Sequence, residues 1–415
     1  MRRFLPLLLL LAGLIGHLIF QAAPAWKKVH GSKGGRDFSS YYYAAEVALA
    51  GGNAYDTPAL AAAAREDGTR KGINPFFYPP PFVLAVVWVK PFALQTAFEL
   101  WFFVNELLLF ACLGLGVWRF GVPLWAAAAL LWTFTPIPDN AWMGQANLLA
   151  LAPALAGLVL ARTRPVVGGI LVGTAAMFKM SPALFLLAWL LARNHRAVLA
   201  AMGTAVGLSL LTLGLVPLGV QTQFYFEILP GFSTGDYHGL TVPISLQANH
   251  SIPDLFDRLL PSAGDLLGDS ARHASAATLA VLLALWAWRV RARPDSPASL
   301  GALTVLMVVA PVYTYEHHLV FLLVALGVAA GEVATMAGVA RQAGRPGVAV
   351  AAWAALVAIW FFLAWPLPWL RAAQAALPAD FAWLTRESKT MAEAGLFALL
   401  WWRAGAPEWP ARPGR

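Results

Sequence analysis

The chain has little cysteine and little charge. Cys112 is the single cysteine in 415 residues, and Asp, Glu, Lys and Arg together make up only 12% of the sequence. A single cysteine excludes an internal disulfide and argues against a cysteine-based metal or redox centre. With so few charged residues beside 59% apolar ones, the chain cannot cover itself with an ordinary polar surface. These absences indicate a protein whose solvent is largely lipid.

The sequence instead contains apolar runs long enough to cross a bilayer, which takes about 20 apolar residues per helix. A membrane β-barrel would show alternating segments of roughly ten residues. We therefore predict an all-α polytopic membrane protein with about twelve spanning helices, within a range of about 10 to 13. The predicted spans are residues 4–20, 80–94, 96–118, 123–138, 145–161, 166–192, 197–219, 274–290, 299–313, 318–339, 347–370 and 389–402.

Orientation follows from lysine and arginine, which favour cytoplasmic loops. The N-terminus resembles a signal peptide, but its apolar run can span, so we expect a retained signal anchor with Arg2 and Arg3 in the cytoplasm. The net charge of +8 is scattered between the spans and forms no nucleic-acid-binding stripe. This topology puts Lys90, Arg193, Arg196, Arg289, Arg291, Arg293, Arg341, Arg345 and Arg403 inside, and conflicts with Arg119, Arg162, Arg164, Arg371, Arg386 and Lys389. The alternative is that residues 166–192 form a short hairpin broken near residues 179–182, which would change the sides of the loops in the middle of the chain.

Two segments are too long to be simple connections, residues 24–79 and 220–273, and we place both on the outer side. Their aromatic content argues against disorder. The first contains an amphipathic stretch at 41–50, followed by Gly51 and Gly52, which predicts a helix lying along the membrane surface. We find no internal repeat, and expect one integral-membrane domain over residues 1–403 with a disordered tail at 404–415.

One aspartate, Asp37, lies in a glycine-rich polar stretch after the first span, preceded by Arg36 and followed by Tyr41 and Tyr42. One interpretation is that Asp37 caps the helix that begins near Ser39, since aspartate is favoured at helix N-termini. The other is that it serves as a catalytic base where the bundle meets water. Consecutive tyrosines on a helix point in different directions, so at most two of residues 41–43 can face one ligand.

Polar residues within the spans are costly in lipid and tend to line cavities. Lys179 lies in an apolar run just before Ser181 and Pro182, and either snorkels to the interface or faces an anion. Gln145 and Asn147 open another span, where their amides either bind hydroxyl groups or cap the helix.

A further polar group lies near the outer ends of later segments, and comprises Asn249, His250, Glu316, His317 and His318. Neighbours on a helix point about 100° apart, so His317 and His318 make a poor metal chelate. As hydrogen-bond donors to a phosphate or a sugar they need no such geometry. Plain hydrogen bonding at the membrane interface is the remaining interpretation.

Taken in order, these segments resemble the glycosyltransferase family 87 pattern of the GT-C superfamily, the polyprenyl-phosphate-mannose-dependent α-mannosyltransferases. The resemblance covers most of the chain. It departs in two places: Lys179 is followed by Met-Ser-Pro where an aromatic or apolar residue and proline are expected, and His250 stands where glutamine is common. The matching segments are residues 36–38 with the tyrosines, 51–56, 77–80, 144–147, 168–169 through 179–182, 249–251 and 316–318.

The resemblance implies transfer of a hexose, mannose before others, from a polyprenyl-phosphate donor to a glycolipid or glycan hydroxyl, with inversion at the anomeric carbon. Asp37 would be the general base, and Lys179, His250, His317 and His318 would bind the donor phosphate. No cofactor, metal or nucleic acid is implied, and the partners are the sugar donor, the acceptor and membrane lipid. Sugar or acceptor contacts would come from Arg36, Tyr41, Tyr42, Gln145, Asn147, Asn249 and Glu316.

Two other classes have many helices too. A transporter or lipid flippase without transferase activity would show repeat symmetry and polar residues near the middle of discontinuous helices. A non-catalytic assembly factor would have no need of Asp37. High alanine, arginine and proline usage is typical of a bacterium with GC-rich DNA, so we expect a multi-pass protein of the cell (inner) membrane. Its site would face the periplasm or the cell exterior.

Overall fold

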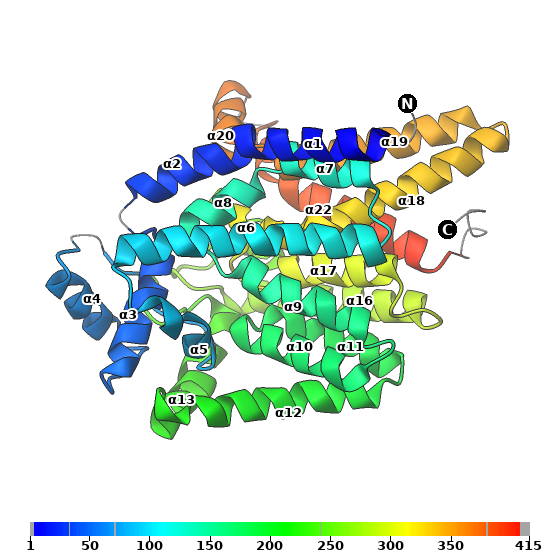
Figure 1. Cartoon of the computed structure of the whole chain (residues 1–415). Helices are drawn as coiled ribbons and strands as arrows, with labels where there is room; N and C mark the ends of the chain where they lie inside the picture. The colour runs from blue at the N-terminus through cyan, green and yellow to red at the C-terminus, as the bar shows by residue number, and fades with distance from the viewer. Residues whose placement is uncertain (1–3, 33, 70–71, 241, 379–380, 407–415) are drawn as a thin grey trace.

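The computed structural model describes residues 4–32, 34–69, 72–240, 242–378 and 381–406. Within these ranges the chain forms helices and turns without a β-strand, which confirms the predicted all-α class. Figure 1 shows the long helices lying roughly side by side, with α3, α4, α5 and α13 grouped at one end of the bundle. The start of α1 and the end of α22 lie toward the other end.

The first half of the chain contains α1 (Leu5–His17), η1 (Leu18–Ala22), α2 (Ala23–Gly31), α3 (Phe38–Leu49), α4 (Thr57–Glu66), α5 (Phe82–Val86), η2 (Val87–Val89), α6 (Leu94–Arg119), α7 (Leu124–Thr133), α8 (Pro136–Met143), α9 (Asn147–Leu160), α10 (Pro165–Phe178), η3 (Ser181–Leu184), α11 (Phe185–Leu191) and α12 (His195–Leu211). The second half contains η4 (Thr212–Gly214), α13 (Leu218–Gln223), η5 (Phe224–Ile228), α14 (Leu229–Gly231), η6 (Phe232–Thr234), α15 (Ile252–Leu259), α16 (Asp269–Val290), α17 (Pro297–Val309), η7 (Glu316–Leu322), α18 (Leu323–Gln342), α19 (Pro346–Ala364), α20 (Leu367–Ala376), α21 (Ala382–Arg386) and α22 (Ser388–Ala404).

Six helical stretches of the described chain are long and apolar enough to cross a membrane. They become up to seven if α8 and α9, which are bent by 118° at their junction, count as one broken span. Shorter apolar helices are α7, α10, η3 with α11, and α17. Several of the twelve predicted spans are therefore short helices, because hydropathy alone does not separate the two kinds. The six long stretches are Leu5–Gly31, Leu94–Arg119, His195–Gly214, Asp269–Val290, Glu316–Gln342 and Pro346–Ala364.

Two predicted boundaries need correction. Residues 80–94 do not form a span, since prolines at 79–81 and Pro91 divide them into α5, η2 and turns. The first helix runs on through α2 to Gly31, so the first outer segment begins after residue 31 instead of at residue 24. The last predicted span, 389–402, is found as α22, which packs against α17 and α19 on one face and exposes Met391 and Trp402 on the other. The predicted tail lies outside the described residues from residue 407 onward.

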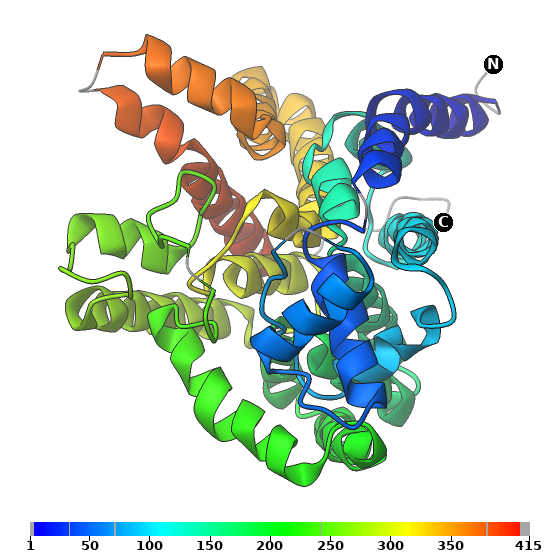
Figure 2. The ribbon, with the colours of Figure 1, turned by 90° about the vertical axis from the view of Figure 1, so that its left-hand side faces the viewer.

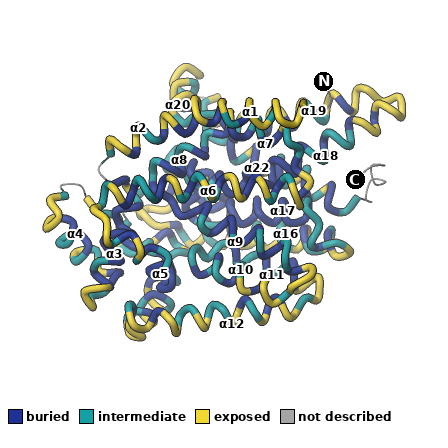
Figure 3. Tube along the Cα trace, viewed as in Figure 1, coloured by how far each residue is buried: buried dark blue, intermediate teal, exposed yellow. Residues whose placement is uncertain are grey.

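The surface of the bundle is apolar along its length. Leu8 of α1, Leu199 of α12 and Val350 of α19 are all exposed, and they point away from a core formed by helices such as α9 and α17. Figure 3 shows this arrangement, with exposed residues on α1 and α12 and buried ones in the centre. Apolar side chains that face outward around a helical bundle form the surface that contacts lipid.

The arginines of the short loops gather at one end of the bundle, which we call the arginine-rich end. Arg162 after α9 pairs with Asp295 before α17 at 3.1 Å, and the guanidinium of Arg289 donates to the Trp402 carbonyl near the end of α22. The turn after Arg119 lies at this same end in Figure 1. The loops that carry Arg119, Arg162 and Arg164, which had conflicted with the predicted topology, therefore agree with the other arginines.

The reason is the missing span at residues 80–94. Without it, the loops up to residue 164 change side relative to the prediction. The break after Phe178 then makes residues 165–191 a hairpin, which returns Arg193 and the later loops to their predicted sides. Lys90, which was expected in the cytoplasm, lies at the opposite end, where its ammonium is 2.7 Å from Glu46 of α3. Arg2 and Arg3 lie outside the described residues.

Glycines bring α10 close to its neighbours. A Cβ atom on Gly169 would lie 2.3 Å from the Ala197 carbonyl oxygen, and one on Gly173 would lie 2.6 Å from that of Ala201. These two glycines are four residues apart, which is the small-residue spacing that lets membrane helices pack closely. α10 thus packs tightly between α9 and α12, and Lys179 follows directly at its end.

The helix predicted at 41–50 is α3, which ends before Gly51 as expected. Residues 38–45 are all buried in protein, so α3 packs against other segments of the chain along this part of its length. Phe38 stacks on Phe98 with ring centres 5.3 Å apart, and Tyr41 packs edge-on against Phe82 at 5.0 Å. Figure 2 looks at this end of the bundle, with α3 and α4 in front. This packing fixes the backbone just before α3, where Asp37 lies.

Candidate active site

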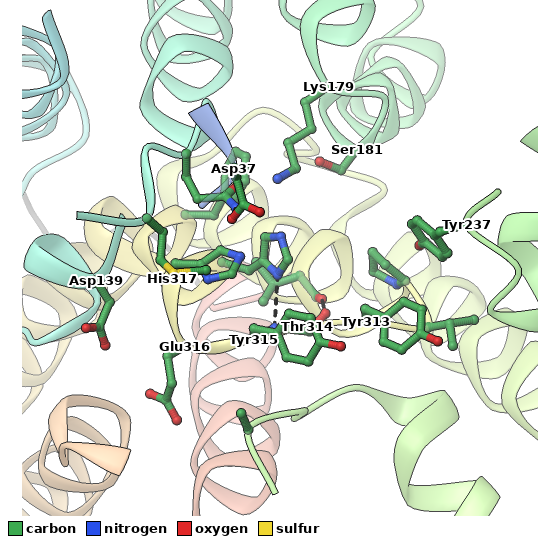
Figure 4. Close-up of a pocket in the computed structure, with 18 of the residues that line it drawn as sticks. Asp37, Asp139, Lys179, Ser181, Tyr237, Tyr313, Thr314, Tyr315, Glu316 and His317 are labelled. Carbon is green, nitrogen blue, oxygen red and sulfur yellow. Dashed lines mark hydrogen bonds between the residues drawn. The ribbon is translucent and has the colours of Figure 1, made fainter. Parts of the chain in front are cut away.

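A cavity of about 1410 Å³ lies among the helix ends that carry most of the predicted polar residues. Pockets for drug-sized ligands measure about 300–1,000 Å³, so this cavity has room for more than one substrate. Figure 4 shows Asp37, Lys179 and His317 around the same space. Its charged lining residues are Lys28, Arg36, Lys179, Arg272 and Arg371, together with Asp37, Asp139 and Glu316. Cations outnumber anions, which favours an anionic ligand.

Asp37 occupies the N-cap position of α3, but its side chain makes no capping hydrogen bond. Its Oδ1 accepts from Asn74 Nδ2 at 2.7 Å and its Oδ2 accepts from Gln145 Nε2 at 2.6 Å. Burial raises the pKa of Asp37 above its ordinary value, while the two amides, Arg36 and Lys179 oppose that shift. The carboxylate is thus held from both sides and directed at the cavity, so the capping interpretation does not hold.

The amide that holds Asp37 is itself held by tyrosines. Tyr78 lines the cavity and its hydroxyl donates to Gln145 Oε1 at 3.3 Å, while the hydroxyls of Tyr41 and Tyr78 lie 2.7 Å apart. A chain of hydrogen bonds therefore runs from Tyr41 through Tyr78 and Gln145 to Asp37. Gln145 is placed by Gly144, which ends α8 in the left-handed conformation with φ of 78°. Neither Gln145 nor Asn147 caps α9 with its side chain.

Lys179 follows the last residue of α10 and takes an extended backbone conformation before the Ser-Pro that starts η3. Its ammonium donates to Asn147 Oδ1 at 2.5 Å and lies 5.8 Å from the ring centres of Tyr78 and Phe321. No described carboxylate lies within 4.0 Å of it. The break in the helix therefore turns the lysine into the cavity instead of toward the membrane interface, with its charge available to an anion.

His317 and His318 line the cavity with their ring centres 4.3 Å apart. The Nδ1 atom of His318 accepts the backbone N–H of Tyr315 at 2.9 Å, so the neutral ring carries its proton on Nε2. That N–H is then the donor that His318 can offer to a ligand. Asn147 Nδ2 donates to the His317 carbonyl at 2.9 Å and so ties this segment to Lys179. The Asn147 side chain thus contacts both Lys179 and His317, which lie far apart in the sequence.

Glu316 also lines the cavity, but its carboxylate is engaged in the wall behind it. Its Oε1 lies 2.8 Å from His250 Nε2, and its Oε2 accepts from Lys389 Nζ. Lys389 is fully buried, and it also donates to the Leu363 carbonyl. This buried group anchors the start of η7, and with it the two histidines.

Five predicted contact residues do not line the cavity. Tyr41 and Asn147 lie one layer behind it and act through Tyr78 and Lys179, as described above. The Tyr42 hydroxyl donates to the Phe92 carbonyl, because consecutive residues of α3 point in different directions. The remaining two, Asn249 and His250, are likewise engaged by other groups of the protein.

The side-chain amide of Asn249 forms hydrogen bonds with backbone groups. Its Oδ1 accepts the Thr314 N–H at 2.8 Å and its Nδ2 donates to the Val312 carbonyl at 2.8 Å. His250, the residue that departs from the family pattern, is buried behind Glu316. Both residues shape the segment before η7 from behind the wall.

Some cavity residues were not assigned from the sequence. Tyr78 lies in the aromatic-proline run but had no role there, and Asn74, just before that run, gave no signal beyond its type. Lys389, which lies behind the cavity wall, was placed in a loop, although it pairs with a glutamate 73 residues away. Among the described residues, no group of three or more His, Cys, Asp or Glu side chains could hold a metal ion.

Comparison with known proteins supports the resemblance noted from the sequence. The sequence model of glycosyltransferase family 87 matches residues 76–314, more than half of the chain. A polyprenol-phosphate-mannose-dependent alpha-(1-2)-phosphatidylinositol pentamannoside mannosyltransferase of Mycobacterium tuberculosis is 27% identical, over 68% of this chain and 63% of its own length. No solved structure shows a significant match.

Two further relatives are polyprenol-phosphate-mannose-dependent alpha-(1-2)-phosphatidylinositol mannoside mannosyltransferases. The one from Mycolicibacterium smegmatis is 32% identical, over 50% of this chain and 47% of its own length. The one from Mycobacterium tuberculosis is 30% identical, over 61% of this chain and 62% of its own length. The chain thus spans less than two thirds of each relative it matches. By its family match, the chain belongs to glycosyltransferase family 87.

Proposed function

We propose that this protein transfers a mannosyl group from a polyprenyl-phosphate donor to a hydroxyl group of a glycolipid. The observation that carries the proposal is Asp37, an unpaired carboxylate held by two amides in a cavity that also contains Lys179. The activities for which the relatives are named support the same donor and acceptor classes. The family match covers residues 76–314, which include the aromatic residues 76–78 and Lys179. Asp37 and Asn74 lie before this stretch.

In the proposed reaction, Asp37 accepts the proton of the acceptor hydroxyl as its oxygen attacks the anomeric carbon of the donor sugar. The bond between that carbon and the phosphate oxygen breaks, and polyprenyl phosphate leaves with the electron pair. Lys179 and the Nε2–H of His318 stabilise the negative charge that grows on the phosphate. A general base of this kind contributes roughly 10²- to 10⁴-fold to a reaction rate.

The expected stereochemical outcome is inversion, because a single displacement needs one base and no carboxylate nucleophile. The other two carboxylates of the cavity are not placed for that role. Glu316 is engaged by His250 and Lys389, and Asp139 accepts from Trp142 Nε1 at 2.9 Å. In Figure 4 both point away from Asp37.

The donor's polyprenyl tail has an apolar path next to Lys179. The cavity continues past Ser181 along Leu184 and Leu187 of the η3–α11 segment. Its facing wall comes from Leu279 of α16 and Met307 of α17. An apolar channel beside a free ammonium suits a lipid phosphate, whose charge and tail need different surroundings.

The distribution of arginine supports an orientation. Short loops rich in lysine and arginine favour the cytoplasmic side, so the arginine-rich end is the cytoplasmic one. The cavity then faces the opposite side of the cell membrane, where glycolipid acceptors of the outer leaflet are within reach.

The test is transfer of radiolabelled sugar from a panel of polyprenyl-phosphate sugars into a glycolipid by purified protein. We expect labelled lipid from the parent, and a loss of about 100-fold or more with Asp37→Asn. Asp56→Asn is the matched control, because Asp56 is a true helix cap at α4, where its carboxylate accepts the Ala59 N–H. Transfer that survives Asp37→Asn would remove Asp37 from the mechanism. Movement of the labelled lipid across proteoliposomes without product would favour a transporter.

A further inference from the structure

A second polar group lines the same cavity and has no part in the reaction proposed above. The Lys28 ammonium of α2 lies 4.9 Å from the centre of the Trp142 ring, and Trp142 Nε1 donates to Asp139 Oδ1 at 2.9 Å. All three side chains face the cavity. We call Lys28, Asp139 and Trp142 the α2–α8 group, after the helices that carry them.

The α2–α8 group has unused binding capacity. No described carboxylate lies within 4.0 Å of the Lys28 ammonium, so its charge is not neutralised by the protein. The second oxygen of Asp139 accepts no hydrogen bond from a described residue. An aromatic ring beside a carboxylate suits a sugar, because the ring covers its apolar face and the carboxylate accepts from its hydroxyls. A free ammonium next to them suits a phosphate.

The cavity reaches the lipid-facing surface beside this group. Phe20 of η1 lines the cavity and is also 61% exposed. Across from α2, the wall continues onto the start of α20, and just before it the Ala364 carbonyl at the end of α19 accepts from Thr135 Oγ1 at 2.7 Å. The apolar residues along this opening are Phe20, Pro24, Pro138, Pro366, Leu367 and Pro368. A lipid-anchored molecule can therefore reach the group from the membrane.

The position of the group relative to Asp37 indicates which substrate it serves. In an inverting displacement the nucleophile approaches the anomeric carbon on the face opposite the leaving phosphate. Figure 4 places Lys179 on one side of Asp37 and Asp139 on the other. With the donor phosphate at Lys179, the hydroxyl that Asp37 deprotonates must arrive from the side of Asp139.

We propose that the α2–α8 group is the acceptor subsite of the proposed reaction, and that Lys28 is the residue that recognises an acceptor whose lipid anchor carries a phosphodiester. The phosphodiester binds Lys28, and a sugar ring of the glycan lies on Trp142 with a hydroxyl donating to Asp139. This inference rests on the proposed function. It assigns recognition of the acceptor to Lys28, Asp139 and Trp142, in the part of the cavity that residues of α2 and α20 also line.

The experiment compares two acceptors at a fixed concentration of polyprenyl-phosphate mannose, a phosphatidylinositol mannoside and an uncharged alkyl mannoside. We expect Lys28→Gln to raise the KM for the phosphatidylinositol mannoside about tenfold, the effect of losing one charge-assisted contact. The KM for the alkyl mannoside and the KM for the sugar donor should change less than twofold. Lys27→Gln is the matched control, since Lys27 is the exposed neighbour on the same helix and does not line the cavity.

A second measurement separates this inference from the proposed function. Equilibrium binding of the phosphatidylinositol mannoside to the parent in lipid nanodiscs needs no turnover, and Lys28→Gln should weaken it about tenfold while Lys27→Gln does not. If the parent transfers sugar but Lys28→Gln and Lys27→Gln bind and use the acceptor equally well, the acceptor site is refuted and the proposed transferase activity is not. Parent protein that transfers nothing to any acceptor would refute the proposed function, and the binding comparison would still decide whether Lys28 recognises the phosphodiester. An increase in the KM for the sugar donor alone would assign Lys28 to the donor and overturn the inference.

Discussion

Removal of the Lys389 ammonium is the sharpest test of how the cavity wall is held. Glu316 is bound by Lys389 on one oxygen and by His250 on the other, and Lys389 has no exposed surface. Lys389→Met keeps most of the side-chain volume and removes the charge, so Glu316 is left buried with one partner. Breaking a buried ion pair in this way costs about 3–5 kcal/mol. Because His250 remains, we expect the lower end of that range.

The assay is the free energy of unfolding in mixed detergent micelles, measured for the single variants and the double variant. Lys389→Met with Glu316→Gln removes both charges, and we expect it to recover most of the loss, to within about 1 kcal/mol of the parent. Lys90→Met is the control, because its pair with Glu46 is partly exposed and such pairs are worth about 0–1 kcal/mol. If Lys389→Met cost no more than Lys90→Met, the anchoring of η7 by this pair would be refuted.

Three further predictions concern the base and its supports. Burial raises the pKa of Asp37, and a base works only when it is deprotonated. On the acid side of the pH profile, kcat/KM should therefore fall at a pH above the ordinary aspartate pKa of about 3.9. An acid limb of the profile at or below that value would contradict the assignment of Asp37 as the base. Gln145→Leu removes a hydrogen bond that lowers the pKa of Asp37, so the acid limb should move to still higher pH, and an unchanged pH profile would count against the contact. Gly144→Ala should destabilise the fold by about 1–3 kcal/mol, because φ is 78° and its Cβ would lie 2.5 Å from the Phe38 Cβ. Gly203→Ala on α12, where a Cβ meets nothing within 4 Å, should be neutral or stabilising in the same unfolding assay.

The local features of the fold were accessible from the sequence. The helix stop at Gly51 and the break after Phe178 both follow from short-range chemistry, since glycine and the Ser-Pro pair act on their own neighbourhood. The resemblance to glycosyltransferase family 87 likewise rested on short motifs, and the family match confirms it. Asp37, Lys179 and His317 are recognisable in the sequence as polar residues beside apolar runs, and they face one cavity.

The features that escaped prediction depend on contacts between distant segments. Asn74 meets Asp37 only because the first outer segment folds back on itself, and Lys389 meets Glu316 only because α22 turns the face that carries Lys389 into the bundle. Hydropathy also misled the topology, since the run at 80–94 is as apolar as a span but is divided by prolines. Pairing over such separations leaves no periodic trace in a single sequence.

The exposure of Phe20 at the rim of the cavity has a consequence for how substrate supply is measured. A substrate that arrives through the side of the bundle comes from the membrane itself. Its effective concentration is therefore its mole fraction among the surrounding lipids. Adding inert phospholipid at constant total substrate should then slow the reaction as effectively as withholding substrate. The crowding and thickness of the host membrane become rate-controlling variables for this protein, in the way that bulk concentration is for an enzyme in water.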